Sequence, residues 1–217
     1  MQRKLFAEAI GTMLLLSTIV GSGIMGENLA NGQPGAALFP HAVAIGGMLF
    51  VLITLFGPIS GAHFNPAVTM VFSLRGDMPM REALPYVITQ IAAGIIGVWL
   101  VHLMFDLSIL QTSVKERSSP GQWASEVVAT AGLILVILGA LRTNAALVPI
   151  MVGAYIMAAL WFTASTSFAN PAVTIARMLS DTFSGVLPAH GAVFIVAQIF
   201  GAILGWQIAN ILWPKER

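Results

Sequence analysis

Two asparagines stand at the head of the same five-residue run, Asn-Pro-Ala-Val-Thr, at residues 65–69 and again at residues 170–174. Asparagine is a preferred helix N-cap and proline is preferred at the first helical position, so Asn65-Pro66-Ala67 and Asn170-Pro171-Ala172 each predict a helix start. The side-chain oxygen of each asparagine can cap its own helix, which leaves the NH₂ group as a free donor. A single Asn-Pro pair usually does no more than begin a helix, but two identical copies predict that both helix starts contribute to one functional site.

Each motif lies in a segment that is too apolar for an ordinary loop, residues 57–74 and residues 165–179. About ten helical residues follow each motif before Arg75 or Asp181, which is about 15 Å, or half of a ~30 Å hydrocarbon core. The sequence therefore predicts two re-entrant half-helices whose N-termini meet near the middle of a membrane.

Irregular backbone at that depth is tolerated only where protein buries it or water lines it. Residues 57–61 and 163–169 are predicted to supply it on the approach to each half-helix. Two helix N-termini aimed at one place create a positive potential, which repels cations, including hydronium. Water can accept hydrogen bonds from the asparagine donors, and this interrupts the chain along which a proton would hop.

The composition requires an apolar solvent. Of the 217 residues, 57% are hydrophobic and 9% are charged, against about 25% charged in a soluble domain. The net charge of +1 gives no indication of a nucleic-acid partner, and the lack of cysteine excludes disulfides and thiolate chemistry. His41, His102 and His190 show no ligand spacing, so neither a metal nor another cofactor is predicted.

Six segments are long and apolar enough to span a bilayer. They are roughly residues 5–25, 37–56, 83–104, 127–141, 147–165 and 193–212. The fourth is expected to begin near Trp123, with Glu126 inside the span.

The loop charges predict the orientation. With six spans both termini share one side, and that side carries seven of the ten basic residues: Arg3, Lys4, Arg75, Arg81, Arg142, Lys215 and Arg217. The other side carries Lys115, Arg117 and Arg177. The prediction is a multi-pass protein of the cell (inner) membrane with both termini in the cytoplasm.

The chain is predicted to be one channel domain, residues 1–217, made of two repeats at about 1–105 and 123–217 that an outer loop, residues 106–122, joins. Each half holds three spans with its Asn-Pro-Ala element between the second and third, so the halves are inverted in the membrane. Ala93 and Gly97 correspond to Gly201 and Gly205 as sites of close helix packing. The fold class is an all-α membrane protein with six transmembrane helices, two half-helices and an inverted 3+3 repeat.

With these motifs the chain resembles the aquaporin, or major intrinsic protein, family over essentially its whole length. The likeness includes residues 7–12 (Ala-Glu-Ala-Ile-Gly-Thr), residues 59–69 (Ile-Ser-Gly-Ala-His-Phe-Asn-Pro-Ala-Val-Thr) and the second Asn-Pro-Ala. The resemblance implies a right-handed bundle in a homotetramer, with one pore in each subunit.

Three further polar residues gain a role from that resemblance. In the family, glutamates such as Glu8 and Glu126 accept hydrogen bonds from the re-entrant loops, so they are expected to be loop braces; the alternative is that both snorkel near a span end. The resemblance also implies that His63 lines the cytoplasmic vestibule, and a satisfied loop histidine is the alternative.

The outer filter departs from the family pattern. Most members carry an arginine directly after the second Asn-Pro-Ala, with an aromatic residue on the second span and often a histidine on the fifth. Counting from the motifs, the equivalent positions here are Ile45, Ala158, Ser167 and Val173, which predicts a wider and more apolar filter. Arg177 either faces the outer vestibule or pairs with Asp181 on the helix surface.

The predicted function is a passive channel for water and small neutral solutes, with a wide filter that favours glycerol-like solutes or arsenous acid. The chain looks most like bacterial aquaporins related to the plant nodulin-26-like group, some of which are associated with arsenic-resistance gene clusters. A water-selective aquaporin is the alternative, and a coupled carrier would need a titratable group at mid-membrane. The sequence has no Ser/His pair at helical spacing and no His-Glu cluster, the patterns that would predict an enzyme. A structural junction protein of the same fold is the remaining alternative.

Overall fold

A computed structural model describes residues 1–30 and 33–214; Lys215 and Arg217, counted above as cytoplasmic charges, lie outside the described residues. The helices are α1 (Gln2–Leu29), α2 (Pro34–Ser60), α3 (Pro66–Leu74), α4 (Met80–Met104), α5 (Pro120–Thr143), α6 (Val148–Phe162), α7 (Pro171–Arg177) and α8 (Pro188–Leu212), with a short 3₁₀ turn, η1 (Ala145–Leu147), before α6. Within the described residues, six helices are long and apolar enough to cross a membrane: α1, α2, α4, α5, α6 taken together with η1, and α8.

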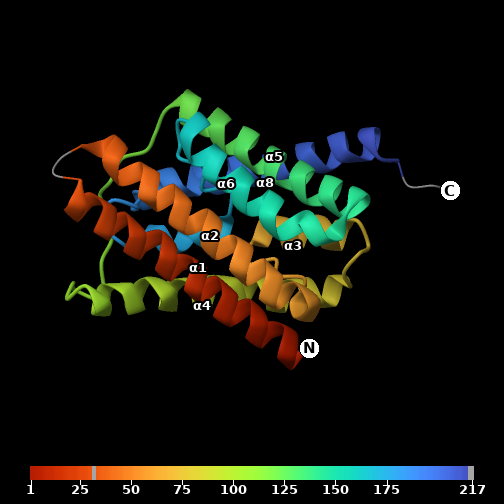
Figure 1. The fold of residues 1–217 in the computed structure, drawn as a ribbon, viewed down its shortest axis with the longest axis horizontal. Coiled ribbons are helices and arrows are strands. Elements are labelled where there is room, and N and C mark those ends of the chain that lie inside the picture. The colour runs from red at the N-terminus through yellow and green to blue at the C-terminus, as the bar shows by residue number, and fades with distance from the viewer. Residues whose placement is uncertain (31–32, 215–217) are drawn as a thin grey trace.

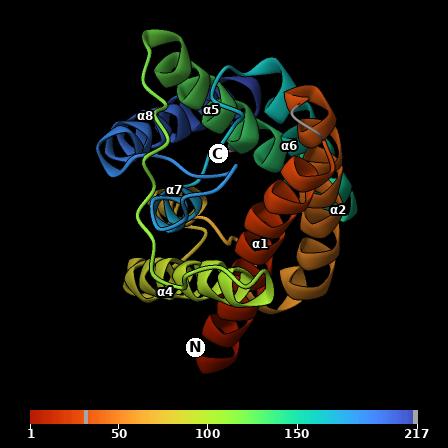
Figure 2. The ribbon, with the colours of Figure 1, turned by 90° about the vertical axis from the view of Figure 1, so that its left-hand side faces the viewer.

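The six long helices form a bundle around the two short ones. In the first half α1 packs against α2 and α4, in the second half α5 packs against α6 and α8, and α2 meets α6 between the halves. The short helices α3 and α7 each contact both α4 and α8, so they lie inside the bundle (Figure 2). Figure 1 shows the N-terminus and the last turns of α8 toward the same end of the molecule.

Glycine allows the first and third helix of each half to approach closely. A Cβ atom on Gly97 of α4 would lie 2.4 Å from the carbonyl oxygen of Met13, and one on Gly205 of α8 would lie 2.4 Å from that of Ala131. Both distances are far below van der Waals contact. The matching positions of the two halves therefore hold α4 against α1 and α8 against α5 in the same way.

Several predicted helix boundaries were wrong by three or more residues, among them the start of α8, which lies at Pro188 and not near residue 193. Helix α2 continues through Gly57 and Pro58 to Ser60, so the irregular approach to the first half-helix begins only at Gly61, whose φ is +88°. Helix α5 begins at Pro120 and not near Trp123, because the Ser119 side chain caps it and Pro120 occupies the first turn. The outer loop between the repeats is therefore residues 105–119, shorter than predicted.

The half-helices are also shorter than the predicted ten residues. Helix α3 has nine residues and α7 has seven, so their lengths are about 14 Å and about 10 Å at 1.5 Å per residue. After α7 the backbone turns back on itself, and the amide of Val186 donates to the carbonyl oxygen of Arg177 at 3.3 Å. Residues 178–187 thereby close the C-terminal end of the second half-helix.

Candidate functional site

The two motif asparagines cap the half-helices. The Oδ1 atom of Asn65 accepts from the amide of Ala67 at 2.9 Å, and that of Asn170 accepts from the amides of Ala172 at 2.9 Å and Val173 at 3.3 Å. Each proline follows at the first helical position, where its missing N–H costs nothing. The sequence signature of a capped helix start is thus realised at both sites.

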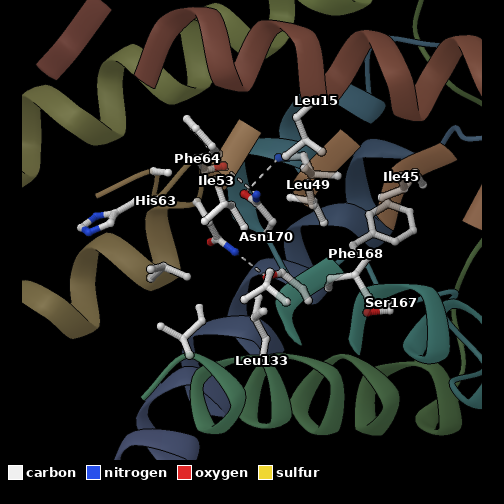
Figure 3. A pocket seen from close by; sticks show the side chains of 18 of the residues that line it. Leu15, Ile45, Leu49, Ile53, His63, Phe64, Leu133, Ser167, Phe168 and Asn170 are labelled. Atoms are coloured by element: carbon white, nitrogen blue, oxygen red, sulfur yellow. Dashed lines mark hydrogen bonds between the residues drawn. The ribbon is translucent and has the colours of Figure 1, made fainter. Parts of the chain in front are cut away.

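The NH₂ groups of the same asparagines cross between the halves. Asn65 donates through Nδ2 to the carbonyl oxygen of Ala169, and Asn170 donates to that of Phe64, both at 2.8 Å (Figure 3). The prediction that both NH₂ groups stay free was therefore half wrong. One hydrogen of each is used in the protein, and the second remains for a solute because both residues line the cavity.

The loops that present these carbonyls have unusual backbone. Ala62 and Phe64 before the first motif, and Ser167 and Ala169 before the second, all have positive φ between 47° and 50°. Such left-handed residues cost about 1–3 kcal/mol each and persist only where the surroundings hold them. The matching pattern in the two loops indicates that each one is held by a dedicated group.

Glu8 is that group for the first loop. Its side chain is fully buried; Oε1 accepts from Ser60 Oγ at 2.7 Å and the amide of His63 at 3.0 Å, and Oε2 accepts from the amide of Phe64 at 2.7 Å. Gln90 of α4 also donates to Oε2 at 2.8 Å. With every lone-pair direction engaged inside the bundle, this carboxylate does not snorkel to the membrane surface.

Glu126 holds the second loop in the same manner and is also fully buried. Its oxygens accept from the amides of Phe168 and Ala169, both at 2.9 Å, and from Nε2 of Gln198 at 2.7 Å. Gln198 also donates to Thr174 Oγ1 at 2.8 Å, as Gln90 does to Thr69 Oγ1 at 3.0 Å. The two halves therefore carry one hydrogen-bond network twice.

A cavity runs past these loops. Aliphatic and aromatic side chains from six helices make most of its wall: Leu15, Ile19, Ile45, Leu49, Ile53, Val68, Phe72, Leu133, Ile137, Val148, Val152, Ile156, Leu160 and Val173. Its polar lining includes Asn65, Asn170, Ser167 and Arg177. Figure 3 shows His63 at one end and Ile45 and Ser167 at the other, with Asn170 between them. An apolar passage with a few polar points offers a solute little to bind except at those points.

Three of the four predicted filter residues line this cavity: Ile45, Ser167 and Val173. The buried Ser167 Oγ has no hydrogen-bond partner in the described part of the chain, so it is available to a solute. Ala158 was a wrong prediction, because it is exposed and does not line the cavity. Counting back along the chain missed the helical phase: Ile156 and Leu160, one turn apart on α6, face inward, and Ala158 lies on the other side.

Arg177 lines the cavity next to Phe168. It is only 4% exposed and lines the wall, its Nε donates to the carbonyl oxygen of Ser184, and its guanidinium carbon lies 3.3 Å from the centre of the Phe168 ring. The alternative pair with Asp181 is not formed among the described residues, where the two ion pairs join Lys4 to Glu82 and Arg75 to Asp77. Asp181 accepts instead from the amide of Val114 at 3.1 Å.

His63 lines the end of the cavity away from Ile45 and Ser167, and its side chain also has partners within the protein. Its Nδ1 lies 3.1 Å from Thr69 Oγ1, and its ring lies against Phe72 and Tyr86 with centroid distances of 4.7 and 5.6 Å. Across the described residues, no group of three or more His, Cys, Asp or Glu side chains is placed to hold a metal ion.

Several residues of the site were not singled out from the sequence. Gln90 and Gln198 are fully buried and donate to the two glutamates. Their signal was the matching position of one polar residue in two apolar spans. Phe168 carried no signal, because its role depends on a stacking contact between an irregular loop and the end of α7.

Comparison with known proteins decides the family. The model of the family described as "Major intrinsic protein" matches residues 1–169. The chain belongs to the major intrinsic protein family. The match ends one residue before Asn170, directly ahead of the half-helix that carries the unusual Val173.

Relatives within the family cover nearly the whole chain. It is 50% identical over 215 residues to "Aquaglyceroporin AqpS" of Rhizobium meliloti, covering 99% of this chain and 92% of that protein. It is 31% identical to "Aquaporin Z" of Bradyrhizobium diazoefficiens, covering 99% and 94%, and 30% identical to "Probable aquaporin NIP-type" of Nicotiana alata, covering 99% and 79%. The X-ray structure of the aquaglyceroporin from Plasmodium falciparum shares the fold, with a TM-score of 0.77, 21% identity and coverage of 98% and 97%.

Proposed function

We propose that this protein is a passive membrane channel for water and small neutral solutes, with an outer filter wide enough for glycerol-like solutes and arsenous acid. The observation that carries the proposal is the pair of facing asparagines, each bonded to the other's loop at 2.8 Å, on the wall of an otherwise apolar cavity. The 50% identity to a protein named an aquaglyceroporin supports the solute class.

Passage through such a cavity needs few polar contacts. A water or polyol oxygen accepts the remaining hydrogen of Asn65 or Asn170, and the N-termini of α3 and α7 add positive potential at the same place. A cation at this place is repelled by the positive potential, and it loses its hydration shell among the aliphatic side chains of the cavity wall. Neutral molecules escape both penalties, which supports a channel that excludes ions.

The width of the outer filter follows from its small or aliphatic side chains. Val173 takes the position at which the family pattern has arginine, Ile45 replaces the aromatic residue, and Ser167 presents an unpartnered hydroxyl. Arg177 supplies a guanidinium four residues further along the helix, beyond Val173. A solute of glycerol size thus meets one hydroxyl and one guanidinium beside a wide apolar wall. Arsenous acid is neutral at pH 7, carries hydroxyl groups and is close to glycerol in size.

The proposal includes a homotetrameric assembly and an inner-membrane location with both termini in the cytoplasm. Six apolar helices carry many exposed aliphatic and aromatic side chains, which suits a lipid bilayer and contacts between subunits of a homotetramer. Lys4 pairs with Glu82 at 3.0 Å at the end of the molecule that also carries Arg75, and this supports a cytoplasmic position for both termini in the inner membrane.

A coupled carrier is the rival with most structural overlap. Coupling requires a titratable group that a permeating ion can reach, whereas Glu8 and Glu126 have their oxygens occupied by loop and glutamine donors. Solute flux that depends on an imposed pH gradient would favour this rival over the passive channel.

Stopped-flow light scattering of proteoliposomes tests the proposal. Osmotic shrinkage should be fast relative to protein-free liposomes, and it should be followed by re-swelling in glycerol and in arsenous acid. Fast shrinkage without re-swelling in either solute would leave the water-selective alternative. No acceleration of water flux would reject the channel itself.

A further inference from the structure

Two cations from the outer loop hold the carbonyl groups that follow α7. Lys115 Nζ donates to the carbonyl oxygen of Phe183 at 2.8 Å, and Arg117 donates through Nε to that of Gly185 at 2.9 Å and through an Nη to that of Phe183 at 3.2 Å. We call residues 115, 117 and 183–185 the outer clamp. It joins the loop between the two halves to the segment that closes the second half-helix, and Figure 2 shows that loop passing beside α7.

The outer clamp reaches the cavity through one residue. Ser184, between the two clamped carbonyls, accepts the hydrogen bond from Nε of Arg177 with its own carbonyl oxygen. Its hydroxyl donates to the carbonyl oxygen of Ile19 on α1 at 3.1 Å. The orientation of the Ser184 carbonyl, and with it the direction of the Arg177 guanidinium, is therefore fixed from both sides.

Arg117 also shares an aromatic partner with Arg177. Their guanidinium carbons lie 5.4 and 3.3 Å from the centre of the Phe168 ring, which lines the cavity. Burial lowers the pKa of Arg117 to about 10, so the group is still protonated at neutral pH. Two like charges at one ring repel each other, and the backbone carbonyls of the outer clamp offset that repulsion.

We infer that Arg117 is a positioning residue for selectivity, which holds Arg177 at the outer end of the cavity as the cation barrier and solute donor that Val173 does not supply. In the described structure Arg177 donates only through Nε, so its Nη hydrogens remain for solute oxygens. Arginine suits the position because its planar fork binds two carbonyls at once, which a lysine cannot do in the same geometry.

This inference rests on the proposed channel function, and one set of proteoliposomes separates the two. Water, glycerol and K⁺ permeabilities are measured for the wild type, Arg117→Gln, Arg117→Lys, Arg177→Gln and the double glutamine variant. Glu116→Gln is the matched control, since it changes a charge in the same loop and Glu116 takes no part in the outer clamp. A wild type without fast water flux rejects the channel, whatever the variants do.

With a conducting wild type, Arg117→Gln should keep water flux within about twofold while K⁺ leak rises about tenfold, as expected for the loss of charge-assisted hydrogen bonds of this kind. Arg117→Lys should lie between, and Glu116→Gln should match the wild type. The double variant should leak no more than Arg177→Gln alone, because one residue acts through the other.

Three results would overturn the inference. The first is that both Arg117 variants exclude K⁺ as well as the wild type does and keep its ratio of glycerol to water permeability. The second is fully additive leaks in the double variant, which would make Arg117 independent of Arg177. The third is failure of both Arg117 variants to insert as monodisperse protein, which would make the residue's role one of folding alone.

Discussion

Asn65 and Asn170 each complete the loop that carries the other, because each side-chain NH₂ group donates to a backbone carbonyl of the opposite half at 2.8 Å. The carbonyls belong to Ala169 and Phe64, both left-handed residues directly before the motifs. Neither half of the chain therefore builds the centre of the cavity alone. The two re-entrant loops are one structure made from both repeats.

Asn65→Asp separates the capping role of this residue from its donor role. A carboxylate still accepts from the amide of Ala67, but it cannot donate to Ala169 and adds a negative charge at the centre of the cavity. We expect slower water flux and a proton leak in proteoliposomes with a trapped pH dye. Asn144→Asp is the control, since Asn144 caps η1 outside the cavity. Proton exclusion equal to the wild type in Asn65→Asp would contradict a barrier centred on the asparagines.

Glu126→Gln should destabilise the second loop more than it changes its shape. Glutamine keeps one acceptor, but its NH₂ group would face an N–H of Phe168 or Ala169, and a buried amide would lose its partner. The cost is about 2–3 kcal/mol, seen as a lower apparent melting temperature in detergent. Glu8→Gln should behave alike, because that carboxylate holds the first loop. Equal melting of both variants and the wild type would show that neither glutamate supports its loop.

Much of this site could be predicted because its signals are local. An Asn-Pro pair determines a capped helix start through one asparagine oxygen and one proline ring, so both half-helices were placed to within a few residues. The recurrence of the motif predicted the inverted repeat. The end of α2 was misplaced for a related reason: Gly57 and Pro58 indicate a break locally, but the preceding turns carry the helix on to Ser60.

What could not be predicted depends on contacts between distant segments. The stacking of Arg177 on Phe168, and the hold of the outer loop on residues 183–185, join parts of the chain that share no sequence pattern. Ala158 failed for a geometric reason. A count along the chain gives a position but no helical phase, and two residues on α6 turn a side chain by about 200°.

The finding that Ile156 lines the cavity and Ala158 does not can be tested on α6. Ile156→Trp places an indole in the cavity wall, whereas Ala158→Trp places the same group on an exposed face. We expect glycerol re-swelling to fall about tenfold for Ile156→Trp and to be unchanged for Ala158→Trp. Both variants should be compared at equal protein content in liposomes, with monodispersity as the folding control. A loss confined to Ala158→Trp would restore the original prediction.

Val173→Arg tests why the outer filter is wide. Val173 is 3% exposed and lines the cavity four residues before Arg177, so the two side chains lie about one helical turn apart on α7. A second guanidinium there would narrow the passage and bind water in place of a polyol. Repulsion by Arg177 would direct it across the cavity toward Ile45 and Ile156, since the outward direction already holds a positive charge.

The expected result is a glycerol permeability at least about tenfold lower, with water flux within about twofold of the wild type. Val173→Thr is the matched control, because it keeps the shape of valine, adds no charge and should leave glycerol flux nearly unchanged. Water and glycerol fluxes are read from the two phases of one stopped-flow trace. An unchanged glycerol phase in Val173→Arg would mean that the narrowest point lies elsewhere, and the assignment of Ile45, Ser167 and Val173 as the selective positions would then be wrong.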